Sequence, residues 1–124
     1  ISDNSVTKNT SHDFVFEQLF QIKKDEIFKV FHCNDNLYIW GAGSFGQGLF
    51  TKFVTNNFKI TGFIDGNSLK WGTQFCGKEV FAPEIINDRS KNMKIIVGSE
   101  PGRLEIVGIL KQKGYKPLQD FLVF

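Results

Sequence analysis

Residues 37–46 read Leu-Tyr-Ile-Trp-Gly-Ala-Gly-Ser-Phe-Gly, and residues 62–65 read Gly-Phe-Ile-Asp. This pattern predicts a buried strand, a glycine-rich turn, a helix, and a second strand that ends in an acid. In the turn, Gly41 suits a tight bend, Gly43 lets the backbone approach a phosphate, and Gly46 lets the helix pack closely. The phosphate is expected at the helix N-terminus, where free N–H groups and the helix dipole favour an anion.

A single acid follows the second strand of this pattern. Asp65 lies 24 residues after Gly41, near the spacing of about 20 residues at which such an acid binds a ribose hydroxyl. A carboxylate there accepts hydrogen bonds from both ribose hydroxyls and repels a 2′-phosphate, which favours NAD-type or UDP-type ligands over NADP. The alternative is a structural role, in which Asp65 caps the turn over residues 66–68.

Three further residues are candidates for the same crevice, because the carboxyl ends of parallel strands meet at one edge of a sheet. Ser99 follows the third predicted parallel strand and is a candidate for contact with a phosphate or sugar, although capping of the next helix is the favoured role. Lys70 and Trp71 lie in the loop after Asp65 and are candidates for pairing with a phosphate or covering a base. A solvated lysine beside a packed tryptophan is the favoured interpretation of that pair.

Catalytic machinery is not evident in the sequence. His12 and His32 fall in the N-terminal segment, away from the predicted crevice, and no Ser-His-Asp set or pair of carboxylates occurs at a credible site. No cluster has the spacing of metal ligands. Tyr38 lies in a strand and Tyr115 directly precedes Lys116, so the tyrosine–lysine pair of short-chain dehydrogenases is missing. The sequence therefore predicts ligand binding with no catalytic or metal-ligating residue.

Hydrophobic periodicity and turn residues place the other elements. Apolar residues recur at helical spacing over residues 12–32, which predicts one long helix or two short ones broken near Lys24 and Asp25. Further helices are expected after the glycine turn to about residue 56, over 83–86 and over 101–113, and strands over 37–40, 59–64, 80–81, 94–97 and 121–124. This order predicts an α/β fold, a three-layer Rossmann-like parallel sheet with an added N-terminal helical segment. The expected division is a polar lead-in and helical segment over 1–35 and a Rossmann-like nucleotide-binding domain over 36–124.

The composition is that of an ordinary globular domain with little net charge. The chain has 124 residues, 41% hydrophobic content and a formal net charge of +2. Its lysines are scattered, so neither nucleic acid nor an anionic membrane is an expected partner. No membrane span or signal peptide is evident, and Cys33 and Cys76 lack the spacing of a metal site or disulfide framework. We expect a cytoplasmic protein with reduced thiols, and the start at Ile1 indicates a piece of a longer chain.

The residues quoted above also carry a family resemblance. With Trp71-Gly72, Gly77-Lys78-Glu79-Val80 and Pro83-Glu84, they resemble the small Rossmann-like, CoA-binding-like domain of bacterial polysaccharide-biosynthesis proteins. That domain precedes the catalytic part of nucleotide-sugar dehydratases and epimerases and of sugar acyltransferases, and related copies accompany sugar methyltransferases and glycosyltransferases. In the acyltransferase relatives it holds the nucleotide sugar. The resemblance covers roughly residues 36–124. It implies nucleoside or sugar contacts from Asp65, and phosphate contacts from Gly41, Gly43, Ser44, Phe45 and Gly46.

Together these features predict a module that binds a nucleotide or nucleotide-sugar, with NAD or a UDP-sugar as candidate ligands and no chemistry of its own. Its expected setting is a larger carbohydrate-modifying transferase, or a nucleotide-sugar dehydratase or epimerase, and its expected partners are other domains of that protein or a second copy. One alternative is half of an NAD-dependent nucleotide-sugar dehydratase or oxidoreductase. The other is a protein-interaction module with an exposed stripe of Phe14, Phe20 and Phe28, for which packing on the sheet is the favoured interpretation.

Overall fold

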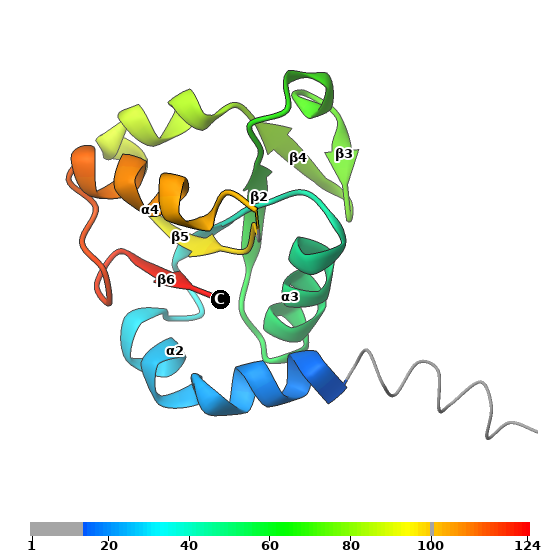
Figure 1. Cartoon of the computed structure of the whole chain (residues 1–124). Coiled ribbons are helices and arrows are strands. Elements are labelled where there is room, and N and C mark those ends of the chain that lie inside the picture. Colours follow the sequence, from blue (N-terminus) through cyan, green and yellow to red (C-terminus); the bar gives the residue numbers. More distant parts are fainter. Residues whose placement is uncertain (1–13, 100) are drawn as a thin grey trace, which may run out of the picture.

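A single sheet of six strands organises the protein, as seen in a computed structural model that describes residues 14–99 and 101–124. The strands lie in the order β3-β4-β2-β1-β5-β6 (Figure 1). Their bounds are β1 Asn36–Trp40, β2 Ile60–Ile64, β3 Gln74–Phe75, β4 Lys78–Phe81, β5 Met93–Val97 and β6 Phe121–Val123. Neighbouring strands are parallel except β3 and β4, which pair antiparallel. The predicted α/β fold with a mostly parallel sheet is confirmed.

Helices cover both faces of the sheet and so complete three layers (Figure 1). One face packs against the helix over residues 14–22, α2 (Lys24–Val30) and α3 (Ser44–Thr55), and the other against α4 (Arg103–Gln112) and the 3₁₀ helix η2 (Pro83–Asn87). Two more 3₁₀ turns are η1 (Ser68–Lys70) and η3 (Arg89–Lys91). Since both faces are covered, the four apolar residues that end β1 are all buried. None of the helices in the described part of the chain has the length and apolar character that crossing a bilayer needs.

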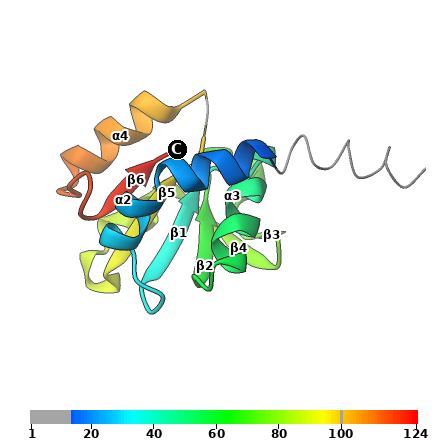
Figure 2. The same cartoon turned by 90° about the horizontal axis from the view of Figure 1, so that it is seen from below.

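The N-terminal helices pack on α3 through aromatic rings. The helix over residues 14–22 lies beside α3 (Figure 2), and the break before α2 falls at Lys23, one residue from the expected break. Phe20 is buried, and its ring centroid lies 5.4 Å from that of Phe53. Phe14 and Phe28 are 58% and 47% exposed. The expectation that the whole stripe packs on the sheet is therefore confirmed for Phe20 and wrong for Phe14, whereas Phe28 is half-covered.

Several element boundaries differ from those expected. The loop after β2 contains the unpredicted two-residue strand β3, which turns into β4 through Cys76 and Gly77, both at positive φ. A strand of two residues is too short to show the alternation by which strands are recognised. Helix α4 begins at Arg103, two residues later than expected, and the segment predicted as a short helix from Pro83 is a 3₁₀ helix. The predicted lead-in and His12 lie outside the described residues.

Candidate functional site

The glycine turn forms where the ends of β1 and β5 touch. Gly41 has a φ of +131°, and a Cβ atom at this position would lie 2.7 Å from the carbonyl oxygen of Gly98. The N–H of Gly41 donates to the carbonyl of Ile64 at 2.7 Å, which ties the turn to β2 as well. A side chain at Gly41 is therefore excluded by both conformation and space. The predicted tight bend is confirmed.

Gly46 determines how closely α3 approaches this turn. A Cβ atom at Gly46 would lie 1.9 Å from the carbonyl oxygen of Gly41 and 3.5 Å from the side chain of Ile39. The predicted close packing is confirmed, and its partner is the backbone of the turn itself. Gly48 serves packing too, because the ring of Phe16 occupies the space where its side chain would be.

Gly43 differs from the other two glycines of the turn. Its φ of −134° and ψ of −165° describe extended backbone, which any residue adopts. A Cβ atom at Gly43 would meet nothing within 4 Å. Gly43 is also the N-cap of α3, where no side chain caps the helix and no acid lies in the first turn. The orphan N–H groups at the start of α3 are therefore not satisfied by a capping side chain.

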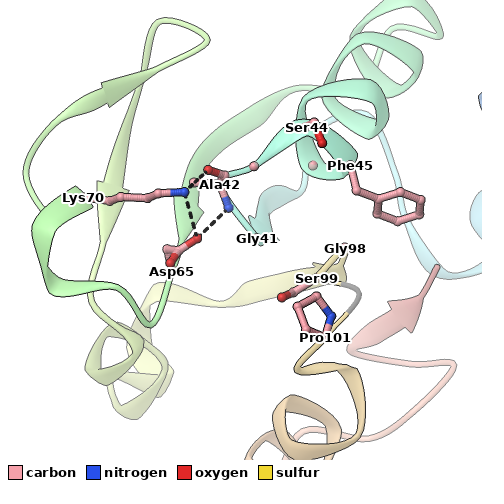
Figure 3. A pocket seen from close by; sticks show the side chains of 11 residues that line it. Gly41, Ala42, Ser44, Phe45, Asp65, Lys70, Gly98, Ser99 and Pro101 are labelled. Carbon is pink, nitrogen blue, oxygen red and sulfur yellow. Dashed lines mark hydrogen bonds and ion pairs between the residues drawn. The ribbon is translucent and has the colours of Figure 1, made fainter. Parts of the chain in front are cut away.

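A pocket of about 290 Å³ opens at this helix N-terminus (Figure 3). Its walls come from the carboxyl ends of β1, β2 and β5, which meet at one edge of the sheet. All seven residues predicted as ligand contacts line it: Gly41, Gly43, Ser44, Phe45, Gly46, Asp65 and Ser99. The remaining lining residues are Ala42, Lys70, Gly98 and Pro101. The structure thus brings the predicted residues together, and contact between them and a ligand stays a prediction.

Asp65 joins the end of β2 to the glycine turn (Figure 3). Its Oδ2 accepts a hydrogen bond from the N–H of Ala42 at 2.9 Å, and its Oδ1 accepts one from the N–H of Asn67 at 2.8 Å. The second bond confirms the turn-capping role that the sequence left open. A carboxylate offers about four lone-pair positions, so Asp65 keeps acceptor capacity for a ligand. Its side chain is 18% exposed and reachable from the pocket.

Lys70 extends from η1 into the same pocket (Figure 3). Its Nζ donates to the carbonyl oxygen of Ala42 at 2.6 Å and lies 3.9 Å from Oδ2 of Asp65. The Lys70 side chain is 40% exposed, so the expectation of a solvated lysine is confirmed in part, whereas the expectation of a packed tryptophan is wrong because Trp71 is 39% exposed. The neighbouring Trp71 instead donates its indole N–H to the carbonyl of Asp65 at 2.6 Å and lines neither this pocket nor the one beside it. The 3₁₀ turn of η1, which directs Lys70 back to the glycines, has no clear periodic signal in the sequence.

A second pocket of about 320 Å³ lies beside the first and shares Asp65 and Ser99 with it. Its other lining residues are Trp40, Gly66, Pro83, Gly102, Glu105, Ile106 and Ile109. The apolar side chains of Trp40, Ile106 and Ile109 line it together with the acidic side chains of Asp65 and Glu105. The favoured expectation that Ser99 caps the following helix is wrong, because the N-cap of α4 is Gly102 and no side chain caps it. Ser99 instead stands where the two pockets meet.

Neither pocket is lined by a tyrosine, histidine or cysteine of the described residues. Tyr38 and Tyr115 are buried in the core beneath α4, and this burial raises the pKa of both phenols. The hydroxyl of Tyr115 donates to the carbonyl of Ile86 at 2.9 Å. His32 precedes β1 and so lies toward the opposite edge of the sheet. Across residues 14–99 and 101–124, no group of three His, Cys, Asp or Glu side chains is arranged to hold a metal ion.

Comparisons with known proteins identify the fold. No protein-family model matches the sequence, and neither does any curated protein. Among solved structures, the chain is similar to RSP, a Rex-family repressor, at 22% identity over 89% of this chain and 51% of that chain, with a TM-score of 0.58. It is also similar to UDP-D-quinovosamine 4-dehydrogenase from Vibrio fischeri, at 20% identity over 73% of this chain and 77% of that chain, with a TM-score of 0.59. RSP in complex with β-NADH matches at 22% identity over 89% of this chain and 52% of that chain, with a TM-score of 0.57. The chain spans about half the length of RSP, and these likenesses show a Rossmann-like fold.

Proposed function

We propose that this chain is a nucleotide-binding module that holds NAD or a nucleotide-sugar and performs no chemistry of its own. The observation that carries the proposal is Gly43, where neither the backbone conformation nor any protein neighbour requires glycine. Glycine is also a favoured N-cap residue, and the space left by its missing side chain lies at the pocket, where it is open to a ligand. A phosphate in that space accepts hydrogen bonds from the first N–H groups of α3, and the dipole of this 12-residue helix favours its charge.

Asp65 selects among nucleotides by its charge. Its two oxygens each accept one backbone N–H and retain lone pairs that suit the two hydroxyls of a ribose. A ligand that carries a phosphate on the 2′-oxygen brings a second negative charge to the same place. NAD and UDP-sugars are therefore proposed over NADP.

The second pocket is the proposed place for the base. Its apolar surface from Trp40, Ile106 and Ile109 suits a flat aromatic ring, and its volume of about 320 Å³ lies in the range of small-molecule sites. Because Asp65 and Ser99 belong to both pockets, a ribose between base and phosphate comes to lie beside the Asp65 carboxylate. The Ser99 hydroxyl is a further proposed contact to the sugar or phosphate.

The structural neighbours support this class of ligand without choosing within it. RSP has been seen with β-NADH and with β-NAD⁺ and operator DNA, and the dehydrogenase is named for a UDP-sugar. NAD and UDP-sugars share a nucleoside diphosphate with free ribose hydroxyls, which is the chemistry that the two pockets suit. Nucleic acid is not proposed as a partner of this chain, because its formal net charge of +2 is small.

The proposed setting is a larger bacterial protein of surface-polysaccharide biosynthesis, in which the catalytic groups belong to other domains or to a second copy. The motif resemblance over residues 36–124 supports this setting, as does a crevice whose described lining residues include no tyrosine, histidine or cysteine. A second candidate is half of an NAD-dependent nucleotide-sugar oxidoreductase. It is favoured by the likeness over 77% of the dehydrogenase chain. NADH formation from NAD⁺ and a UDP-sugar by the full-length gene product that contains this chain would favour this second candidate.

The proposal is tested by isothermal calorimetry with NAD, NADP and UDP-sugars. We expect saturable heat with NAD or a UDP-sugar and weaker binding of NADP. Gly43→Ala is expected to abolish this binding while it lowers the unfolding free energy by less than about 1 kcal/mol, because the added methyl group meets no protein atom within 4 Å and only the N-cap preference for glycine is lost. Gly108→Ala is the matched control, since this glycine of α4 also has open space and lines neither pocket. Absence of heat with every ligand at millimolar concentration would overturn the proposal.

A further inference from the structure

Of the described residues that line the pocket at the glycine turn, Lys70 alone has a cationic side chain. Its ammonium group donates to the neutral carbonyl of Ala42 at 2.6 Å and stands 3.9 Å from the carboxylate of Asp65 (Figure 3). An ammonium has three donors. The 3.9 Å separation exceeds the length of a hydrogen bond, so two of these donors are not committed to either residue.

The backbone of Lys70 is firmly held. Its N–H donates to the carbonyl of Asn67 at 3.0 Å, and its own carbonyl accepts from both the N–H and the hydroxyl of Thr73, at 3.1 Å and 2.6 Å. The indole of Trp71 anchors the next residue to the carbonyl of Asp65. In contrast, the Lys70 side chain is 40% exposed and has four rotatable methylene groups. The backbone of Lys70 is therefore fixed, whereas its ammonium group can move.

The charges of the pocket show what this cation does for a ligand. A diphosphate placed at the N-terminus of α3 lies close to the Asp65 carboxylate, and like charges at such range repel each other. Lys70 stands between the glycine turn and that carboxylate, where it offsets the repulsion. A hydrogen bond from an ammonium to a phosphate oxygen is also stronger than one to a neutral carbonyl, because both partners are charged.

We propose that Lys70 is a ligand-responsive cation, which leaves the Ala42 carbonyl for the ligand's phosphates and makes the site select nucleoside diphosphates over nucleosides. This inference rests on the proposed function and adds a residue and a selection rule to it. In the free protein Lys70 closes the glycine turn against η1. In the complex it neutralises the phosphate charge beside Asp65, and water replaces it on the Ala42 carbonyl.

The experiment compares Lys70→Met with the wild-type protein by NMR titration with ADP, UDP, adenosine and uridine, a method that reaches millimolar affinities. We expect Lys70→Met to weaken binding of ADP or UDP at least tenfold and binding of the matching nucleoside less than twofold. Lys70→Arg keeps the charge and is expected to bind the diphosphate within about threefold of wild type. Lys111→Met is the matched control, because Lys111 lies in the last turn of α4, at the end far from the pocket.

A second measurement needs no variant. Reductive methylation of the wild-type lysines is followed by peptide mass spectrometry, with and without each ligand. The diphosphate is expected to protect Lys70 and leave Lys111 unchanged, and the nucleoside is expected to protect neither. A methionine variant that binds nucleoside and diphosphate with equal losses, or a Lys70 that the diphosphate does not protect, would overturn this proposal alone. Failure of the wild-type protein to bind any of the four ligands would overturn the proposed function as well.

Discussion

Gly46→Ala tests the packing that shapes the site. The new Cβ atom would lie 1.9 Å from the Gly41 carbonyl oxygen, whereas ordinary contacts begin near 3.4 Å. That oxygen cannot retreat, because the turn is fixed by the hydrogen bond from Gly41 to Ile64 and by its contact with Gly98. Helix α3 must therefore move outward by roughly 1 Å, which is the overpacking that costs about 1–3 kcal/mol and occasionally more.

Because the overlap at 1.9 Å involves a backbone oxygen, we take the upper end of that range, about 3 kcal/mol. Replacing glycine by alanine in a helix is worth about 1 kcal/mol at most, and subtracting this gain leaves an expected loss of about 2 kcal/mol of unfolding free energy for Gly46→Ala. For a chain of this size that corresponds to a melting temperature lower by roughly 8 °C. Gly108→Ala isolates the propensity gain, because its surroundings are open, and it is expected to raise the unfolding free energy by about 0.5–1 kcal/mol.

Urea denaturation followed by circular dichroism measures both variants against the wild-type protein. An unfolding free energy of Gly46→Ala within about 0.5 kcal/mol of wild type would contradict the expected clash, since substitutions that disturb no packing usually change stability by no more than that. Equal changes in both variants would contradict it as well, because the effect would then belong to helix propensity and not to the contact with Gly41.

Three other changes test separate parts of the structure. Leu118→Gly is expected to raise the unfolding free energy by about 0.5–1 kcal/mol, because Leu118 is exposed and has a φ of +62°; lower stability in urea would contradict this. Asp65→Ala is expected to lower it by about 2 kcal/mol, because two backbone N–H groups lose a charged acceptor; an unchanged urea midpoint would contradict this. Exposed Cys33 is expected to react with iodoacetamide before Cys76 at about pH 8, because burial raises the pKa of the Cys76 thiol and only the thiolate reacts. Peptide mapping should show that the two alkylation rates become more similar as the pH rises above about 8. Equal alkylation rates of Cys33 and Cys76 at about pH 8 would contradict the partial burial of Cys76.

The central strands were predictable because both of their faces are covered. Burial on both sides demands continuous apolar runs, and residues 37–40 and 95–97 have such runs. The glycine turn was equally predictable from sequence, since a φ of +131° at Gly41 is a conformation that few other residues adopt. The α/β fold and the crevice at the carboxyl ends of the strands could therefore be predicted, because buried strands require apolar runs and the tight turn requires glycine.

The loop after β2 was less predictable because its order depends on single hydrogen bonds. The 3₁₀ turn η1 is held by hydrogen bonds that the side-chain oxygens of Asp65 and Asn67 accept from the backbone N–H groups of Asn67 and Leu69, and such bonds leave no periodic pattern in the sequence. The position of Lys70 follows from that turn, so a solvated lysine was the reasonable expectation from sequence. Similarly, a helical pattern of phenylalanines does not reveal which ring the sheet covers, and Phe14 is exposed where Phe20 is buried.

The three glycines of the turn show which part of such a motif carries information about a ligand. Gly41 and Gly46 are required by the protein itself, since a side chain at either position would collide with backbone atoms. A domain that bound nothing would need both of them to build this turn. Gly43 has extended backbone and open space, so folding alone does not require glycine there. Gly43 and the uncapped N-terminus of α3 are consequently the features that favour a bound phosphate, and a comparison of Gly43→Ala with Gly46→Ala separates loss of binding from loss of fold.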